Sequence, residues 1–208
     1  MKVSRNPFVA GEGLPLMLAL AAAVVIILRY YDPWYAAIPA LLFALLYFVF
    51  RDPVRNVPPV ALGIVSPVDG VVESIEETDR CVVQGEAYRI RIRIDALGTY
   101  TARSPVEGRV MDLHSRAEGV GPECPANALW VRTDEGDDVV LQFEGYRLGL
   151  APRSFIGFGE RVGLGERCAY LRLARYADLS MPKAGRVQVT PGQRVLAGSD
   201  LIGLVPHP

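Results

Sequence analysis

The chain begins with two long apolar runs separated by a short polar break. Residues 13–28 carry no charge, residues 29–33 read R-Y-Y-D-P, and residues 34–50 form a second uncharged run. At about 1.5 Å of helix rise per residue, each run spans roughly 25 Å, slightly less than a bilayer core of about 30 Å. Tyrosine and tryptophan flank the break, as in the interfacial belts of membrane proteins. The pattern predicts a tail and a two-helix membrane hairpin in residues 1–50.

Other interpretations of these runs stay open. A cleaved signal peptide would use Lys2 and Arg5 as its basic start, but the small residues 21–23 lie inside the first run and a second run follows. A hairpin buried in a globular core, or one that enters a single leaflet, also fits the short runs. Basic residues precede the first run and follow the second, so the positive-inside rule places the remaining chain on the cytoplasmic side of the cell membrane.

After Pro58 and Pro59 the pattern changes to short β-branched or alternating runs. Residues 71–72, 82–83 and 139–141 are of this kind, and residues 89–94 alternate strictly as R-I-R-I-R-I. Strict alternation predicts a strand with one buried and one solvated face. Because no amphipathic pattern long enough to form a helix stands out after Pro59, we expect residues 51–208 to form one mainly β domain.

A weak repeat, P-x-x-G-x-V, begins at Pro67, Pro105 and Pro182. We expect each proline to enter a turn, each glycine to supply an unusual backbone angle, and a strand to follow. The last copy continues through residues 189–202 in a hairpin pattern similar to the barrel-sandwich hybrid of lipoyl and biotinyl domains. Lys183 does not lie at such a hairpin tip, so a swinging-arm carrier is not expected.

Composition narrows the functional classes. Hydrophobic residues make up 50% and charged residues 22% of the chain, which excludes general disorder. With 22 basic and 23 acidic residues the net charge is −1, so we expect no nucleic-acid partner. Three cysteines and two histidines, without a C-x-x-C pair, favour neither a disulfide framework nor a metal site.

Taken in order, several motifs resemble the short, membrane-anchored form of the phosphatidylserine decarboxylase family. F-R-D-P-V-R at residues 50–55 is similar to the family's F-R-D-P-x-R, and S-P-V-D-G at residues 66–70 to its P-A-D-G. R-S-P-V-E-G at residues 103–108 resembles N-R-x-P-x-x-G. The resemblance covers nearly the whole chain. It implies a self-made cofactor, in which a Gly–Ser bond cleaves and the serine becomes a pyruvoyl group that decarboxylates a phospholipid.

The same resemblance shows where the chain departs from the family. The processing segment I-[KR]-F-G-S-R-V-D falls on residues 171–178, L-R-L-A-R-Y-A-D, so Arg175 takes the serine position. The segment D-V-H-V-N-R-x-P falls on residues 98–105, so Tyr100 takes the histidine position. Arginine has no hydroxyl to attack and eliminate, and a phenol with a pKa of about 10 is a poor base near neutrality. Asp69, from P-A-D-G, is the acid–base residue that remains.

A few single residues could carry chemistry or structure of their own. Ser180, in a predicted strand, and Ser199, after Gly198, are the nearby serines that could be processed instead; cleavage before Ser199 would release ten residues. Asp69 could be structural, with its carboxylate bonded to a nearby backbone N–H in an Asp–Gly turn. Three residues lack the neighbours that a base, a nucleophile or a Schiff-base amine needs: His114, Cys124 and Lys183.

The sequence thus predicts a decarboxylase-related membrane protein of phospholipid metabolism that has lost processing and holds no cofactor. Guanidinium groups pair bidentately with phosphate and carboxylate, so we expect Arg175, Arg103 and Tyr100 to contact an anionic phospholipid. A second copy or an active decarboxylase relative is the expected protein partner. Two alternatives remain: an active pyruvoyl enzyme that makes phosphatidylethanolamine through another serine, and a non-catalytic membrane adaptor.

Overall fold

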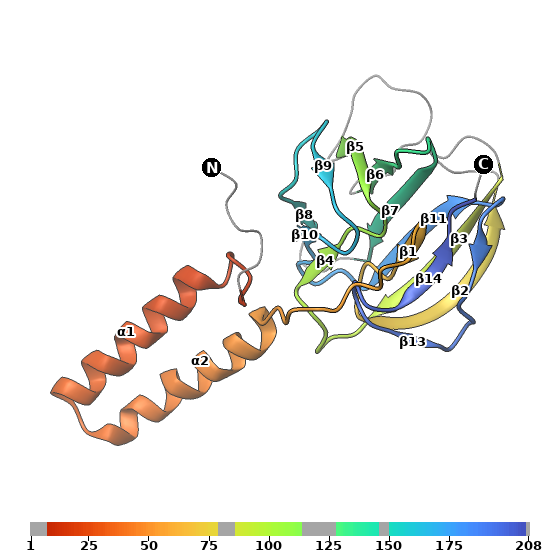
Figure 1. Cartoon of the computed structure of the whole chain (residues 1–208). Coiled ribbons are helices and arrows are strands. Elements are labelled where there is room, and N and C mark those ends of the chain that lie inside the picture. Colours follow the sequence, from red (N-terminus) through yellow and green to blue (C-terminus); the bar gives the residue numbers. More distant parts are fainter. Residues whose placement is uncertain (1–7, 79–85, 114–127, 146–149, 207–208) are drawn as a thin grey trace. The chain divides into compact units, whose positions relative to one another are not determined.

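A computed structural model describes residues 8–78, 86–113, 128–145 and 150–206. The chain divides into two compact units, Met1–Val54 and Arg55–Pro208. The first unit is helical and the second is built from strands, so the protein is mainly β with an N-terminal helical hairpin (Figure 1). This agrees with the predicted fold class at that level.

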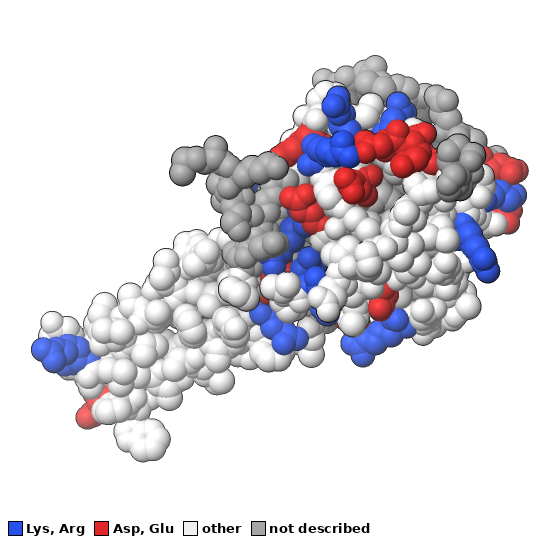
Figure 2. Space-filling model, viewed as in Figure 1, with Lys and Arg blue, Asp and Glu red and all other residues white. Residues whose placement is uncertain are grey.

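The N-terminal unit consists of α1 (Leu14–Tyr30), the short 3₁₀ helix η1 (Pro33–Ala36) and α2 (Ala37–Phe50). Proline in the first turn of α1 and of η1 fits positions where no intrahelical N–H partner exists. The base of the hairpin is closed by backbone bonds from Ala10 N–H to Phe50 O and from Asp52 N–H to Phe8 O, both 2.8 Å. In Figure 2 the hairpin surface is almost entirely uncharged except near its tip.

Length and apolar composition make Pro33–Phe50 capable of crossing a membrane, whereas Leu14–Tyr30 is shorter. The apolar side chains of this unit are largely exposed, with Trp34 at 87% and Ile38 at 76%. Contiguous apolar surface on this scale marks a contact with lipid or another protein. These features support membrane association of the N-terminal unit.

The β unit contains one eight-stranded sheet and two three-stranded sheets. Their orders are β13-β2-β3-β11-β7-β6-β5-β9, β1-β14-β12 and β4-β10-β8, with every pairing antiparallel. The strands are β1 (Gly63–Val65), β2 (Gly70–Thr78), β3 (Ala87–Ile94), β4 (Thr101–Arg103), β5 (Gly108–Leu113), β6 (Ala128–Arg132), β7 (Asp138–Glu144), β8 (Arg153–Ser154), β9 (Arg161–Val162), β10 (Arg167–Tyr170), β11 (Tyr176–Pro182), β12 (Arg186–Val187), β13 (Arg194–Val195) and β14 (Leu201–Leu204).

The strand orders show that the β unit is an internal duplication. Read inward from each edge, the large sheet is β13-β2-β3-β11 on one side and β9-β5-β6-β7 on the other. The small sheets β1-β14-β12 and β4-β10-β8 match in the same way. One half, β4 to β10, is therefore inserted between β3 and β11 of the other half, and the β7–β11 pairing joins them.

Hydrogen bonds at the repeated motifs match between the halves. Val65 N–H donates to Pro105 O at 2.9 Å, and Arg103 N–H donates to Pro67 O at 2.8 Å. The S-P-V-x-G motifs at residues 66–70 and 104–108 are thus structurally equivalent. Further matching bonds, all 2.7–2.9 Å, are Ser66 Oγ to Val68 O, Ser104 Oγ to Val106 O, Gly198 N to Ser66 O and Gly165 N to Ser104 O.

The repeated glycines serve a different purpose from the one expected. Gly70, Gly108 and Gly185 do not have positive φ angles, so the prediction of an unusual backbone angle was wrong. A Cβ on Gly70 would lie 2.2 Å from Arg93 O, and one on Gly108 would lie 2.2 Å from Arg132 O. Glycine is required because the neighbouring strand approaches too closely for a side chain.

The alternating segment behaves as predicted. Ile90 and Ile92 of β3 are fully buried, while the alternating arginines Arg89, Arg91 and Arg93 lie on the other face of the sheet. Their core includes buried residues from both halves. The predicted strands at residues 71–72 and 139–141 fall in β2 and β7, and residues 82–83 lie outside the described residues.

Three connections between large and small sheets meet at one end of the domain. Residues 95–100 connect β3 to β4 and residues 171–175 connect β10 to β11; the third lies between β7 and β8, and of it Gly145 and residues 150–152 are described. The registers place Ile94, Glu144 and Tyr176 at the same end of the large sheet, since Tyr176 pairs with Arg93 and with Glu144. This crossover end is where the chain enters and leaves the inserted half.

We expect Gly70→Ala to destabilise the protein by about 1–3 kcal/mol, because its Cβ would overlap backbone. Gly157→Ala is the control, since its added Cβ would lie 3.8 Å from Glu160 Oε2, an ordinary van der Waals contact. The measurement is thermal unfolding of the full chain in detergent. Equal melting temperatures for the two variants would contradict the close-approach explanation.

Candidate functional site

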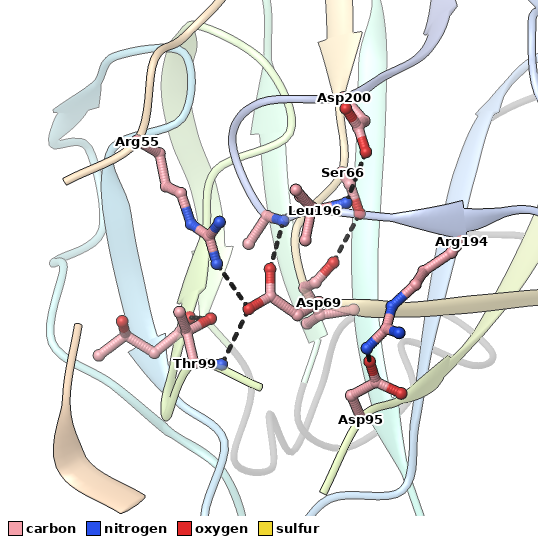
Figure 3. Close-up of polar contacts among 11 residues, drawn as sticks. Arg55, Ser66, Asp69, Asp95, Thr99, Arg194, Leu196 and Asp200 are labelled. Atoms are coloured by element: carbon pink, nitrogen blue, oxygen red, sulfur yellow. Dashed lines mark hydrogen bonds and ion pairs between the residues drawn. The ribbon is translucent and has the colours of Figure 1, made fainter. Parts of the chain in front are cut away.

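Asp69 lies just before β2 and is 6% exposed. Its Oδ2 accepts hydrogen bonds from Arg55 Nη2 at 2.8 Å and from the Thr99 backbone N–H at 3.0 Å. Its Oδ1 accepts one from the Ala197 N–H at 2.8 Å (Figure 3). A carboxylate that accepts three hydrogen bonds, one of them from a guanidinium, is held firmly in place.

This arrangement fits a structural role for Asp69, but not through a neighbouring N–H as the sequence suggested. Thr99 and Ala197 are 30 and 128 residues away in sequence. The Asp69 carboxylate therefore joins the linker at Arg55, the 95–100 connection and the turn before β14. Sequence reasoning missed these partners, although Arg55 was visible in the F-R-D-P-V-R motif.

Arg175 occupies the end of the 171–175 connection. Its backbone N–H donates to Glu144 O at 3.1 Å, and its carbonyl accepts from the Ile94 N–H at 2.8 Å. Its side chain is exposed, with Cζ 5.9 Å from the centre of the Tyr176 ring. The main chain of Arg175 is therefore fixed while its guanidinium faces solvent.

The preceding turn is strained. Ala174 N–H donates to Leu171 O at 3.0 Å, which closes a turn whose central residues, Arg172 and Leu173, have φ angles of 44° and 69°. Left-handed conformations cost roughly 1–2 kcal/mol per non-glycine residue. The turn is held despite this because Leu171 N–H also bonds Tyr100 O at 2.9 Å. Strain of this kind is concentrated at functional positions.

Tyr100 belongs to a row of aromatic rings. Its ring centre lies 5.8 Å from that of Tyr170, which lies 4.9 Å from that of Phe155. Tyr100 and Arg175 share the crossover end with Asp69, because Gly70 and Arg175 both border Ile94 at the end of β3. With strands about 4.8 Å apart, the backbones of Asp69 and Arg175 are about 10 Å apart.

Arg103 is placed differently from the other predicted site residues. It is 5% exposed, and its Nη1 donates to Gly165 O at 3.0 Å. It occupies the opposite end of β4 from Tyr100, against the Gly165 and Gly198 turns. The structure thus brings Asp69, Tyr100 and Arg175 to one end and packs Arg103 into the interior.

The other candidates are accounted for by their surroundings. Ser180 is buried within β11 and pairs with Arg89 on one side and Val140 on the other. Ser199 follows Gly198, whose φ is 68°, in the turn before β14. Ion pairs with Glu77 and Glu86 raise the pKa of Lys183, which keeps its amine protonated. His114 and Cys124 lie outside the described residues.

A charged cluster that sequence reasoning missed lies beside Arg175. Arg91 binds Asp178 through two hydrogen bonds, Nε to Oδ1 at 2.8 Å and Nη2 to Oδ2 at 2.6 Å. Arg91 Nη2 also bonds Glu144 Oε2 at 2.7 Å, and its Cζ lies 5.4 Å from the Tyr176 ring centre. The hydrogen bond to Asp178 is the main cause of a raised Arg91 pKa. The alternation of arginine and isoleucine at residues 89–94 pointed to Arg91 in the sequence, but it did not show that β11, which carries Asp178, pairs with β3.

The second half holds a cavity of about 490 Å³ at the place equivalent to Asp69. Glu107 corresponds to Asp69 in the S-P-V-x-G motif, and it is exposed and paired with Arg161. The two halves therefore differ sharply at matching positions. Residues that line the cavity include Leu62, Val106, Glu107, Asp134, Glu135 and Val205.

We expect Asp69→Asn to destabilise the protein by about 2–3 kcal/mol, because a buried charge-assisted clamp is lost. Glu107→Gln, the equivalent change in the other half, should cost less than about 1 kcal/mol, since its ion pair is exposed. Thermal unfolding of both variants in detergent checks this. Similar losses of melting temperature would show that Asp69 is no more structural than Glu107.

No family model matches the chain. A search of solved structures gives a glucose permease IIA from Mycoplasma capricolum, with TM-score 0.47 and 15% identity over 68% of this chain and 94% of that one.

Curated proteins of similar length match along almost the entire chain. A phosphatidylserine decarboxylase proenzyme of Nitrosomonas eutropha is 30% identical, covering 92% of this chain and 93% of that protein. The Nitrosomonas europaea protein of that name has the same identity and coverage. That of Burkholderia mallei is 29% identical over 97% of both chains. The chain belongs to the phosphatidylserine decarboxylase family.

Proposed function

We propose that this chain is a membrane-anchored member of the family that does not process itself and that binds an anionic phospholipid head group at its crossover end. The observation that carries the proposal is Arg175, an exposed arginine at the position aligned with the family's processing serine. The relatives named above are called proenzymes, which means precursors that are cleaved, and we propose that this chain is not cleaved.

Loss of processing follows from the chemistry of residues 174 and 175. Formation of a pyruvoyl group requires a hydroxyl that attacks the preceding carbonyl and is then eliminated, and arginine has none. Ser180 is a poor replacement because it lies inside a paired central strand. Ser199 lies in the turn whose Ala197 N–H binds Asp69, so cleavage there would cut the segment that holds this clamp. The proposal therefore assigns no pyruvoyl cofactor to the chain.

Head-group binding is supported by the placement of Arg175. Its guanidinium is solvent-facing, whereas its main chain is fixed by Glu144 and Ile94. A guanidinium offers paired donors that match phosphate and carboxylate oxygens. The half-buried Tyr100 lies at the same crossover end of the β unit. The apolar hairpin gives the chain access to lipid. Arg103 is left out of this site because its burial directs it elsewhere.

The finer features of the predicted architecture and location belong to this proposal. The duplicated halves, each with a small sheet packed beside part of the large one, support the barrel-sandwich hybrid description. Basic residues at both ends of the hairpin support a cytoplasmic position for the β unit.

The first test is the intact mass of the purified full chain, together with a carbonyl-reactive probe. We expect one species near 22.7 kDa that does not react with the probe. Two fragments, the smaller bearing a carbonyl, would instead establish an active pyruvoyl decarboxylase, and their masses would identify the processed serine.

The second test is the melting temperature of the full chain in detergent with short-chain phosphatidylserine or phosphatidylglycerol. A ligand that binds only the folded state stabilises it, by about 2.7 kcal/mol at one hundred times its Kd. We expect Arg175→Ala to remove most of this shift and Arg175→Lys to restore part of it. Arg186→Ala, an exposed arginine on β12, is the control and should keep the full shift.

An Arg175→Ala protein that keeps the wild-type lipid shift would overturn head-group binding at this residue. An absent shift in the wild-type chain would favour the non-catalytic adaptor. Neither result depends on the mass measurement.

A further inference from the structure

We infer that the crossover end of the β unit docks on the lipid bilayer through three exposed leucines, one from each of the segments at residues 95–100, 150–152 and 171–175. This goes beyond head-group binding, because it concerns contact with hydrocarbon and does not require Arg175 to recognise any particular lipid. The residues are Leu97, Leu150 and Leu173.

The three leucines are exposed although they are large and apolar. Leu97 is 74%, Leu173 55% and Leu150 43% exposed. A single exposed leucine is ordinary in a soluble protein, but one on each of three separate loops at the same end is a pattern. Leu171 N–H bonds Tyr100 O, and Tyr170 pairs with Arg153, which ties the three connections together.

The duplication provides an internal comparison for Leu97. The turn at residues 95–98 closes with Gly98 N–H to Asp95 O at 3.0 Å, and its counterpart at residues 133–136 closes with Gly136 N–H to Thr133 O at 3.1 Å. The central residues are Ala96 and Leu97 in the first turn. In the second they are Asp134 and Glu135. The fold therefore tolerates an acidic pair at these positions, and Leu97 is not needed to form the turn.

Leu173 has no folding reason for its position either. It adopts a left-handed conformation, φ 69°, in which a leucine is strained, and its side chain remains exposed. Glycine or asparagine would form this turn at lower cost. A strained and solvent-exposed leucine gains its stabilisation from something outside the β unit.

The charges around these leucines suit a bilayer surface. Arg153 and Arg175 are exposed and Arg172 is half-buried; Arg172 and Arg175 lie on the 171–175 connection, and Arg153 begins β8 directly after residues 150–152. Leucines flanked by arginines bind membranes by combining apolar insertion with attraction to anionic lipids. Because the three leucines come from separate segments and are flanked by arginines, we argue for a lipid surface as their partner.

The covalent connection to the hairpin favours the same partner. Arg55, which binds Asp69 at this end, follows Phe50 of the apolar helix by only five residues. An extended chain of that length reaches at most about 18 Å. A bilayer that holds the hairpin is therefore within reach of the crossover end.

The test uses the full chain in nanodiscs of phosphatidylcholine alone and of phosphatidylcholine with phosphatidylglycerol. Nitroxide labels are attached at Leu97→Cys, Leu173→Cys and, as the control, Glu135→Cys in the matching turn at the opposite end of the large sheet. Cys81 and Cys124 are replaced by serine. Cys168 can stay, because burial raises its pKa to about 12 and keeps the thiol unreactive. Collision with oxygen and with a water-soluble nickel complex reports whether each label contacts lipid or water.

We expect the oxygen-to-nickel collision ratio to be several-fold higher at residues 97 and 173 than at residue 135, in both kinds of nanodisc. Adding Leu97→Glu to the residue 173 label should lower its ratio toward that of residue 135. The melting temperature should not change, because glutamate already occupies the matching turn.

Ratios at residues 97 and 173 equal to that at residue 135 would overturn the inference. Spin–spin broadening at these sites would do so as well, by showing that a second copy covers them. The Arg175→Ala melting experiment is unaffected by either result, so failure of docking and failure of head-group binding are distinguishable.

Discussion

The Asp69 carboxylate is the contact on which the candidate site depends. It is nearly buried and binds three segments that are far apart in sequence: the linker at Arg55, the connection at Thr99 and the turn at Ala197. A buried anion needs such partners, since an unpaired one would be costly. These three contacts of Asp69 hold the crossover end in place without a ligand.

Duplication explains both the regularity and the asymmetry of the β unit. Matching strand orders and matching bonds at Ser66 and Ser104 show that the two halves form by the same local rules. The halves differ where one is inserted into the other. In the inserted half a hairpin turn joins β6 to β7. The equivalent strands of the other half, β3 and β11, are instead connected to β4 and β10. The strained turn at residues 172–173 and the exposed Arg175 arise at that point. The site is thus a product of the insertion.

Membership of the phosphatidylserine decarboxylase family and the chemistry of the site point in different directions. Identity of about 30% over more than nine-tenths of the chain makes the relationship plain. Arg175 and Tyr100 stand where the motif resemblance aligns the family's processing serine and histidine, and the proposal that this chain does not process itself rests on that alignment. The crossover end combines the exposed guanidinium of Arg175 with a row of aromatic rings, in a chain that also carries an apolar helical hairpin. Head-group binding without turnover is the function proposed for this combination.

The sequence by itself determined the apolar hairpin, the alternating strand at residues 89–94 and the family, because each follows from local pattern or from the order of short motifs. The alignment of Arg175 with the processing serine stays a prediction. The sequence did not determine why Gly70 and Gly108 are glycines, which follows from a neighbouring strand's carbonyl and not from their own φ angles. Nor did it separate buried Arg103 from exposed Arg175. Those distinctions, like the partners of Asp69 and Arg91, depend on strand pairings across tens of residues, which only the tertiary structure decides.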